Sequence, residues 1–390
     1  MHADTRNGPM HRLVTVTRAD RVVTYERRNE TWAGTETDLT GRWPTISPTG
    51  DRYSLSVVDT VEARSRLEVR DFETHELIGT PYVSEPGGPA AIAPRVPHYA
   101  SWSPDGRYLS YVVPTAAGLT LFFANSEHLD VPTASVVGSP LFSAWLPDSS
   151  ALVLHHAAEV SLVDPASGIA ALVSDEAIGF RAPATTRKPG VYAYARRVDG
   201  TVALIVASPE GEKTIATYET GVVFSFRPDH DELTVATTAD PSAGVFNRLE
   251  VVEVATGEAR TLWRSPYVAY WWHPDGQRVV ILVPTQMGDG RYALYCLDPQ
   301  GGMVTATPGF IPSEDTRLAL GFFDQYAQSI SPWDSTGEHF AISGRHVVDG
   351  VSSSFGDPVG DMVMLWSAEP NTLLAPIGAG GIAGFSPSIA

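Results

Sequence analysis

The sequence contains a single cysteine, Cys296, so the chain cannot form an internal disulfide bond. Cys296 lies within an alternating apolar stretch, Tyr292–Leu297, that is typical of a β-strand. A free cysteine in such surroundings is far more often a small apolar core residue than a reactive group. We therefore predict a buried structural thiol at this position.

Long apolar runs are also missing. No stretch approaches the roughly 18 residues that are needed to cross a bilayer. Residues 1–12 are polar and lack the apolar segment of a signal peptide. The sequence thus predicts a protein without membrane insertion and with a cytoplasmic location.

Basic residues are scarce, since 27 Lys and Arg stand against 45 Asp and Glu, for a formal net charge of −18. A nucleic-acid-binding protein needs a basic face to neutralise phosphates, so this balance argues against a nucleic acid as partner. Electrostatics alone favour a cationic or neutral partner, or a metal ion. Our interpretation is that the charge mainly keeps a large protein in solution.

What the chain does contain is a repeat built on proline and glycine, of which it has 30 and 34. A small or aromatic stretch leads into Ser-Pro-Asp-Gly or a relative, and an alternating apolar strand follows. The clearest copies begin at Ser103 and His273. The motif predicts a tight turn, in which proline presets φ, aspartate caps the turn and glycine adopts a positive φ. The motif prolines, which recur about every 48 residues, are Pro48, Pro104, Pro147, Pro183, Pro228, Pro274, Pro332 and Pro387.

Each turn is followed by three alternating apolar segments, for example 108–115, 119–125 and 129–137. Together with the strand before the turn, these make four antiparallel strands per repeat, which is the content of one β-propeller blade. The sequence thus predicts an all-β propeller of four-stranded antiparallel blades.

The two ends of the chain complement each other. Residues 384–388 are typical of the opening strand of a further blade, whereas residues 12–41 hold strands that lack an opening strand. We predict that the C-terminal strand joins the N-terminal blade and closes the ring, which removes exposed edges. This gives eight blades, or seven if the N-terminal strands only extend a neighbouring blade. Residues 1–11 are predicted to form a flexible N-terminus and residues 12–390 a single propeller domain.

The Ser-Pro-Asp-Gly strand openings resemble the WD40-like (PD40) repeats of the TolB family, which also occur in the propellers of prolyl oligopeptidases. The resemblance extends from about residue 12 to residue 388, and segment 321–326 (GFFDQY) resembles part of some bacterial TolB-like proteins. The resemblance implies the fold and leaves the activity open. A Tol–Pal role does not transfer, because TolB itself is periplasmic and carries an additional domain. Peptidase activity does not transfer either, because the sequence lacks a Gly-x-Ser-x-Gly nucleophile elbow.

Long loops mark one face of the expected ring, opposite the Pro-Asp-Gly turns. They comprise residues 83–98, 238–247, 284–291, 311–325 and 345–361. Loops of this length on a rigid scaffold often carry function, and tolerated insertions are the alternative. We therefore expect a protein, a peptide or a small organic ligand to bind at this loop-rich face.

Residues that open the inner strands are expected to surround the channel entrance. A circle of aromatic residues that also contains one acid, one histidine and one arginine could hold a small organic ligand. Ordinary packing of the channel is the alternative, and we favour it for most of these residues. The catalytic candidates are His98, Asp324 and Tyr326, and the ligand-binding candidates are Tyr99, Arg181, Tyr270, Trp271 and Gln325.

Metal binding has one loosely defined candidate. Asp349, Asp357 and Asp361 could supply oxygen ligands to Ca²⁺, although their spacing does not match an EF-hand and acidic surface loops are common. The sequence identifies no other cofactor.

Histidines outside the channel receive less weight. His155 and His156 are neighbours in a strand, so their side chains point to opposite faces and cannot share one metal ion. His273 and His339 lie at or next to motif turns, on the face that we expect to be plain. None of the four is counted among the site residues.

Two functions from different classes fit these features. The first is a cytoplasmic, non-catalytic scaffold that binds a protein or peptide at the loop-rich face. The second is an enzyme, a lyase or cyclase, with its site at the mouth of the channel, where Asp324 beside His98 could transfer protons. The fold alone cannot choose between them. A hydrogen bond between these two side chains in a deep pocket would favour the enzyme.

Overall fold

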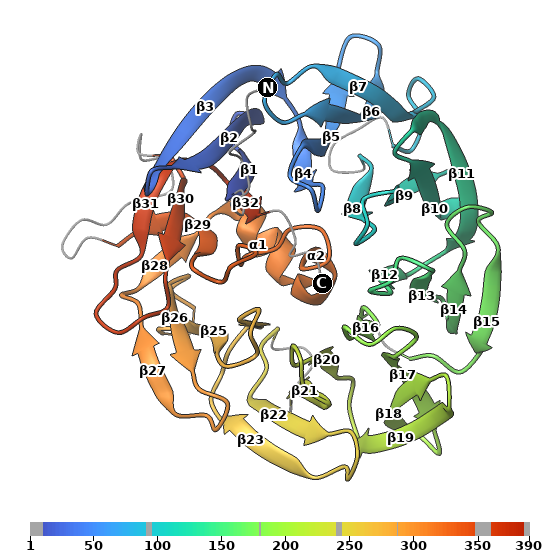
Figure 1. Ribbon diagram of the computed structural model, residues 1–390, viewed down its shortest axis with the longest axis vertical. Coiled ribbons are helices and arrows are strands. Elements are labelled where there is room, and N and C mark those ends of the chain that lie inside the picture. The colour runs from blue at the N-terminus through green and yellow to red at the C-terminus, as the bar shows by residue number, and fades with distance from the viewer. Residues whose placement is uncertain are drawn as a thin grey trace, which may run out of the picture.

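The computed structural model describes residues 11–90, 96–178, 181–238, 244–286, 288–347 and 360–385. The strands of this part of the chain form seven β-sheets, which stand around a common centre in the order of the sequence (Figure 1). Two short helices, α1 (Glu314–Leu320) and α2 (Phe323–Tyr326), lie in the middle of the ring. The predicted all-β propeller is confirmed.

Six of the sheets contain four strands each, all antiparallel to their neighbours. Their inner strands are β32 (Ile382–Phe385), β4 (Arg42–Ile46), β8 (His98–Trp102), β12 (Leu141–Trp145), β16 (Ala184–Thr185) and β20 (Val223–Phe226). The second strands are β1 (Arg12–Val16), β5 (Arg52–Asp59), β9 (Tyr108–Thr115), β13 (Leu152–His156), β17 (Tyr192–Val198) and β21 (Glu232–Thr237). The third strands are β2 (Arg21–Arg28), β6 (Arg64–Asp71), β10 (Gly118–Asn125), β14 (Glu159–Val163), β18 (Thr201–Ser208) and β22 (Arg248–Glu253). The outer strands are β3 (Thr31–Thr40), β7 (Leu77–Val83), β11 (His128–Gly138), β15 (Ala170–Ser174), β19 (Gly211–Tyr218) and β23 (Ala259–Trp263).

The seventh sheet is larger, because it joins two repeats. Its strands are β24 (Ala269–Trp272), β25 (Val279–Pro284), β26 (Tyr292–Leu297), β27 (Met303–Ala306), β28 (Phe310–Pro312), β29 (Phe340–His346), β30 (Met362–Trp366) and β31 (Ala375–Ala379). The short strand β28 pairs with both β26 and β29 and so connects the two repeats. The expected inner strand of the last repeat is reduced to isolated bridges, one from Ser331 to Phe385 and one from Trp333 to Phe340. The count of eight blades, with seven as the alternative, therefore stays a prediction.

The Ser-Pro-Asp-Gly motif forms the tight turn that its residues predict. In the copy at Ser103, the Ser103 hydroxyl donates to Asp105 Oδ1 over 2.7 Å and accepts from the Tyr108 amide over 2.9 Å. Gly106 has a φ of 71°, which a side chain disfavours. Its amide donates to the Ser103 carbonyl over 2.8 Å. Ser103, Asp105 and Gly106 thus hold the turn that leads from an inner strand to the second strand.

The C-terminal strand pairs with the N-terminal sheet, as expected. β32 runs antiparallel to β1, with Leu13 opposite Phe385 and Val16 opposite Ile382. The Thr15 hydroxyl donates to the Ile382 carbonyl over 2.5 Å. The strand begins two residues before the predicted start, and residues 386–388 of the predicted strand lie outside the described residues. Strands from the two ends of the chain therefore share one sheet.

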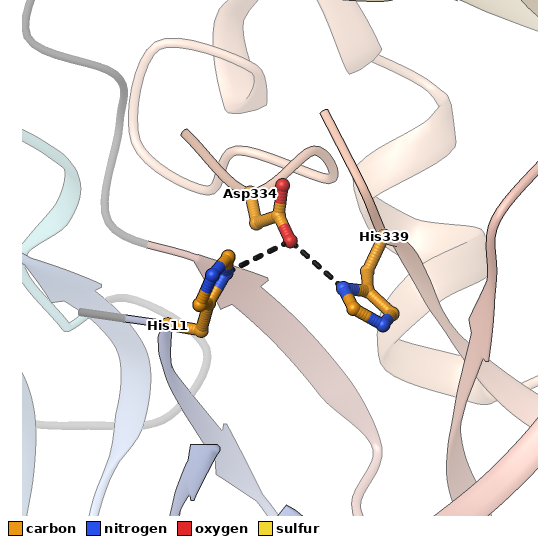
Figure 2. Close-up of side chains that lie close together, drawn as sticks. All are labelled: His11, Asp334 and His339. Atoms are coloured by element: carbon orange, nitrogen blue, oxygen red, sulfur yellow. Dashed lines mark hydrogen bonds and ion pairs between the residues drawn. The ribbon is translucent and has the colours of Figure 1, made fainter. Parts of the chain in front are cut away.

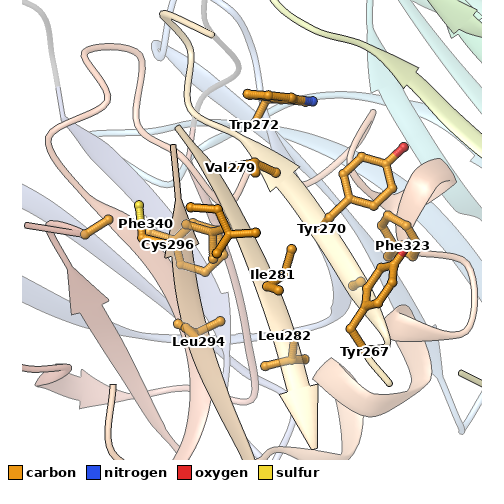
Figure 3. Close-up of a cluster of buried hydrophobic side chains, with 14 of the residues drawn as sticks. Tyr267, Tyr270, Trp272, Val279, Ile281, Leu282, Leu294, Cys296, Phe323 and Phe340 are labelled. Atoms are coloured by element: carbon orange, nitrogen blue, oxygen red, sulfur yellow. The ribbon is translucent and has the colours of Figure 1, made fainter. Parts of the chain in front are cut away.

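Apolar side chains fill the space within and between the sheets. Figure 3 shows the core around β24, β25 and β26, where Ile281, Leu294 and Cys296 are fully buried. Burial raises the pKa of the Cys296 thiol to about 11, so the thiol stays protonated at neutral pH. This agrees with the predicted structural role of the cysteine. In the described part of the chain, no helix is long and apolar enough to cross a bilayer.

Candidate ligand-binding site in the central channel

The segment before the last repeat enters the channel as two helices. Residues 311–325 were expected to form a long loop, and that expectation is wrong for most of the segment. Helix α1 begins after Ser313, whose hydroxyl accepts from the Thr316 amide over 3.0 Å, and Glu314 and Asp315 occupy its first turn. An N-cap serine followed by acidic residues is a helix-start signal that the sequence already carries.

The first two residues of helix α2, Phe323 and Asp324, contact parts of the ring that surround the channel. The Phe323 ring is buried and lies 5.4 Å from the Tyr270 ring and 6.0 Å from the Trp271 ring. Asp324 Oδ2 accepts from the Ala182 amide over 2.9 Å, and Oδ1 lies 3.4 Å from Arg181 Nη1. These two neighbouring residues thus contact different parts of the ring.

The other two residues of α2 reach further sheets. Gln325 is fully buried, and its Oε1 accepts from the Ser143 amide of β12 over 2.7 Å. The Tyr326 ring stacks on Trp43 of β4 at 5.0 Å and meets the Tyr99 ring of β8 edge-on at 5.1 Å. Gln325 and Tyr326 were expected to open an inner strand, and this is wrong because they belong to a helix that occupies the channel.

The structure brings most of the candidate site residues together around α2, as packing partners of one another. Tyr99 contacts Tyr326, Arg181 pairs with Asp324, and both Tyr270 and Trp271 contact Phe323. In this arrangement the circle of aromatic residues encloses a helix of the same chain. A ligand at this level of the channel would have to displace α2.

His98 and Asp324 do not form the pair that proton transfer would require. The His98 ring packs against Tyr99 at 4.6 Å, and its Nδ1 lies 3.1 Å from the Val96 carbonyl. Burial lowers the pKa of His98, which keeps the imidazole neutral. Burial raises the pKa of Asp324, against the opposing attraction of Arg181. Among the described residues, no hydrogen bond links the two side chains.

A cavity of about 380 Å³ lies on the other side of α2, at the ends of the inner strands. We call it the funnel. Its floor is formed by Phe323, Asp324, Ala327 and Gln328. Its wall includes the motif prolines Pro48, Pro104, Pro147, Pro183, Pro228, Pro274 and Pro332 and the tryptophans Trp102, Trp145, Trp271, Trp272 and Trp333. The funnel therefore opens on the face of the Pro-Asp-Gly turns, which the sequence indicated to be plain.

The charged groups of the funnel already have partners. Arg187 pairs with Asp229 over 2.5 Å at the wall. The Arg227 guanidinium is buried, donates to the Gly276 carbonyl over 2.6 Å and pairs with Glu232 over 2.6 Å. With these charges compensated, the apolar surface of the funnel comes from the motif prolines and from the accessible edges of tryptophans that are otherwise buried.

The three aspartates predicted to bind a metal ion differ in what the structure shows of them. Asp349 and Asp357 lie outside the described residues, so a Ca²⁺ site there stays a prediction. Asp361 pairs with Arg345 over 3.2 Å, and this cation would compete with a metal ion for its carboxylate. A group that the sequence did not single out, His11, Asp334 and His339, converges at the motif turn of the last repeat (Figure 2). His339 adjoins a motif turn with extra residues, but nothing local points to His11.

Comparisons with known proteins agree with the fold. A crystal structure of the eukaryotic initiation factor matches 98% of this chain and 99% of its own chain, with a TM-score of 0.56 at 11% identity. The fold is a β-propeller. No protein-family profile matches the sequence, and no curated protein sequence matches it.

Two further solved structures match about three quarters of this chain. TolB from Acinetobacter baumannii matches over 76% of this chain, with a TM-score of 0.42 at 12% identity. This chain spans 62% of that TolB chain. The β-propeller domain of the Trilobed protease from Pyrococcus furiosus matches over 74% of this chain and 90% of its own, with a TM-score of 0.46 at 13% identity. At such identities the likeness concerns the fold alone.

Proposed function

We propose that the protein is a non-catalytic, cytoplasmic binding scaffold that holds an extended, uncharged peptide segment in the funnel. The observation that carries this proposal is the composition of the funnel wall, which combines seven motif prolines with five tryptophans around about 380 Å³. The proposal keeps the scaffold expected from the sequence and moves its working surface to the opposite face.

The chemistry of the wall favours a peptide. Indole and pyrrolidine rings offer rigid apolar surfaces, which bind peptide segments with little loss of side-chain entropy. Aromatic-lined grooves hold extended, proline-containing peptides in this way in several recognition domains. A charged segment is disfavoured, because Arg187 and Asp229 already satisfy each other and Arg227 is bound to Glu232.

An enzyme, a lyase or cyclase, is the second candidate, and one observation favours it. Asp324 lies on the funnel floor, and burial raises the pKa of its carboxyl, as a general acid requires. Against this, its two oxygens are engaged by the Ala182 amide and by Arg181, and His98 has other partners. We therefore prefer the scaffold.

A phage-displayed peptide library panned against the full chain tests the proposal. Gln328→Trp places a bulky ring on the funnel floor and is expected to abolish enrichment of the selected peptides. Leu172→Trp is the matched control, because it introduces the same side chain on the outer strand β15, where Leu172 is exposed. Equal enrichment by all three proteins would overturn the funnel as the binding surface.

Metabolite profiling of a strain that lacks the protein separates the two candidates. The scaffold predicts no accumulated small molecule, whereas a lyase or cyclase predicts that its substrate accumulates. Complementation with Asp324→Asn then decides the role of this carboxyl, because a scaffold should be restored by this variant and an acid catalyst should not.

A further inference from the structure

The group of His11, Asp334 and His339 joins parts of the chain that are far apart in sequence. His11 immediately precedes β1, while Asp334 and His339 flank the motif turn before β29. In Figure 2 the three side chains point toward one another. We propose that these residues bind a divalent transition-metal ion, with Zn²⁺ as the best match, and that the ion fastens the start of β1 to the last repeat.

The spacing of the ligand atoms suits such an ion. Asp334 Oδ2 lies 3.1 Å from His11 Nδ1 and 2.9 Å from His339 Nδ1, and the three atoms lie within 4.8 Å of one another. Ligand atoms around tetrahedral Zn²⁺ are separated by about 3.3 Å, given metal–ligand distances of about 2.0 to 2.2 Å. The two distances to Asp334 Oδ2 are already close to this separation, so an ion would mainly have to draw the two imidazole nitrogens toward each other.

The carboxylate is held in a way that leaves one oxygen for the ion. Asp334 Oδ1 accepts from the Thr336 hydroxyl over 3.0 Å and from the Glu338 amide over 2.9 Å. Oδ2 faces the two imidazoles instead. Outer contacts of this kind fix the orientation of a metal ligand and contribute to affinity.

The surroundings are shielded from solvent. The Asp334 side chain is 2% exposed, and those of His11 and His339 are 12% and 19% exposed. The Trp32 ring packs edge-on against His339 at 5.7 Å. Metal ligation uses the neutral imidazole and the ionised carboxylate, so the ion would replace the two imidazole–carboxylate hydrogen bonds by one bond from each of the three atoms to the metal.

The ligand set selects the class of metal. Two imidazole nitrogens and one carboxylate suit Zn²⁺ and its neighbours in the first transition series. Ca²⁺ and Mg²⁺ prefer shells made of oxygen atoms and are disfavoured. Three protein ligands leave the fourth tetrahedral position for water. Because the three ligands come together only in the folded chain, metal binding would also stabilise the folded state.

Titration of the untagged, chelator-treated full chain with Zn²⁺ and with Co²⁺ tests this proposal. We expect one equivalent to bind, with the visible absorption of tetrahedral Co²⁺ and a rise in melting temperature. His11→Gln and His339→Gln should each weaken binding by at least about 10-fold, the smallest loss usual for outer-shell changes. His128→Gln, which replaces an exposed histidine on β11, is the control and should bind as the parent does.

Circular dichroism and melting without metal establish that each variant is folded. If Co²⁺ gives no tetrahedral spectrum with the parent chain, or if the spectrum and affinity persist in both His11→Gln and His339→Gln, the site does not exist as proposed. Thr336→Val gives a finer readout, because it removes only an outer contact of the carboxylate and should weaken binding without abolishing it.

Discussion

The two sides of the central channel are built in opposite ways. On one side, α1 and α2 occupy the middle of the ring, and each residue of α2 contacts a different part of the ring. On the side of the motif turns, the channel widens into a funnel lined by proline and tryptophan. Among the described residues, α2 thus closes the channel beneath the funnel, and the side of the short turns is open.

This difference shows that long loops on a face do not by themselves leave that face available for binding. A long insertion can fold back into the nearest unfilled space, because burying its apolar side chains is favourable. Phe323 does so among three aromatic rings. Short turns cannot reach the axis, so the repeated prolines remain as a ring around open space. Substitutions on the two sides should therefore differ in whether they affect stability.

The largest effect is expected from Phe323→Ala. Phe323 is 5% exposed and lies 6.1 Å or less from the rings of Phe246, Tyr270 and Trp271. Its truncation should lower the free energy of unfolding by about 3 to 5 kcal/mol, because a cavity opens in the middle of the ring. Chemical denaturation monitored by tryptophan fluorescence measures the change.

Gln328→Ala provides the comparison from the funnel floor. It should change the free energy of unfolding by no more than about 0.5 kcal/mol, as is usual for positions outside the core. If both variants lose the same stability, α2 is not a structural plug and the contrast between the two sides fails.

The contrast also explains what the sequence could predict. The turn at Ser103, Asp105 and Gly106 depends on neighbouring residues, and β32 pairs as its repeat pattern indicates. These features are local or repeated. The helix α2 has four residues, too few to show a helical period, and its place depends on the space left by the whole ring. The meeting of His11 with Asp334 likewise depends on ring closure, because 323 positions separate them.

A smaller effect is expected from Gln325→Leu. This change removes the acceptor of the buried Ser143 amide, and an unpaired buried amide costs about 1 to 3 kcal/mol of stability. Ser143→Ala is the control, since it keeps the backbone donor and so keeps the hydrogen bond. Thermal unfolding of both variants measures the difference. Equal melting temperatures would show that the hydrogen bond between Gln325 and Ser143 does not help to hold α2 in the channel.

The smallest effect concerns the pH dependence of Asp324→Asn. Burial raises the pKa of Asp324 above its ordinary value of 3.8, although Arg181 attracts the charged form. A raised carboxyl pKa favours the folded state when the group is protonated, so its contribution is present below pH 3.8 and is lost as the pH rises through the raised value. Asparagine can still accept from the Ala182 amide and does not ionise. The melting temperature of the parent, measured relative to that of Asp324→Asn, should therefore fall as the pH rises through this window. Asp229→Asn is the control, because it removes one carboxylate from a half-exposed ion pair in the funnel. A rise over the same window would mean that the Arg181 pair outweighs burial, and α2 would then be held in the channel by an ion pair as well as by packing.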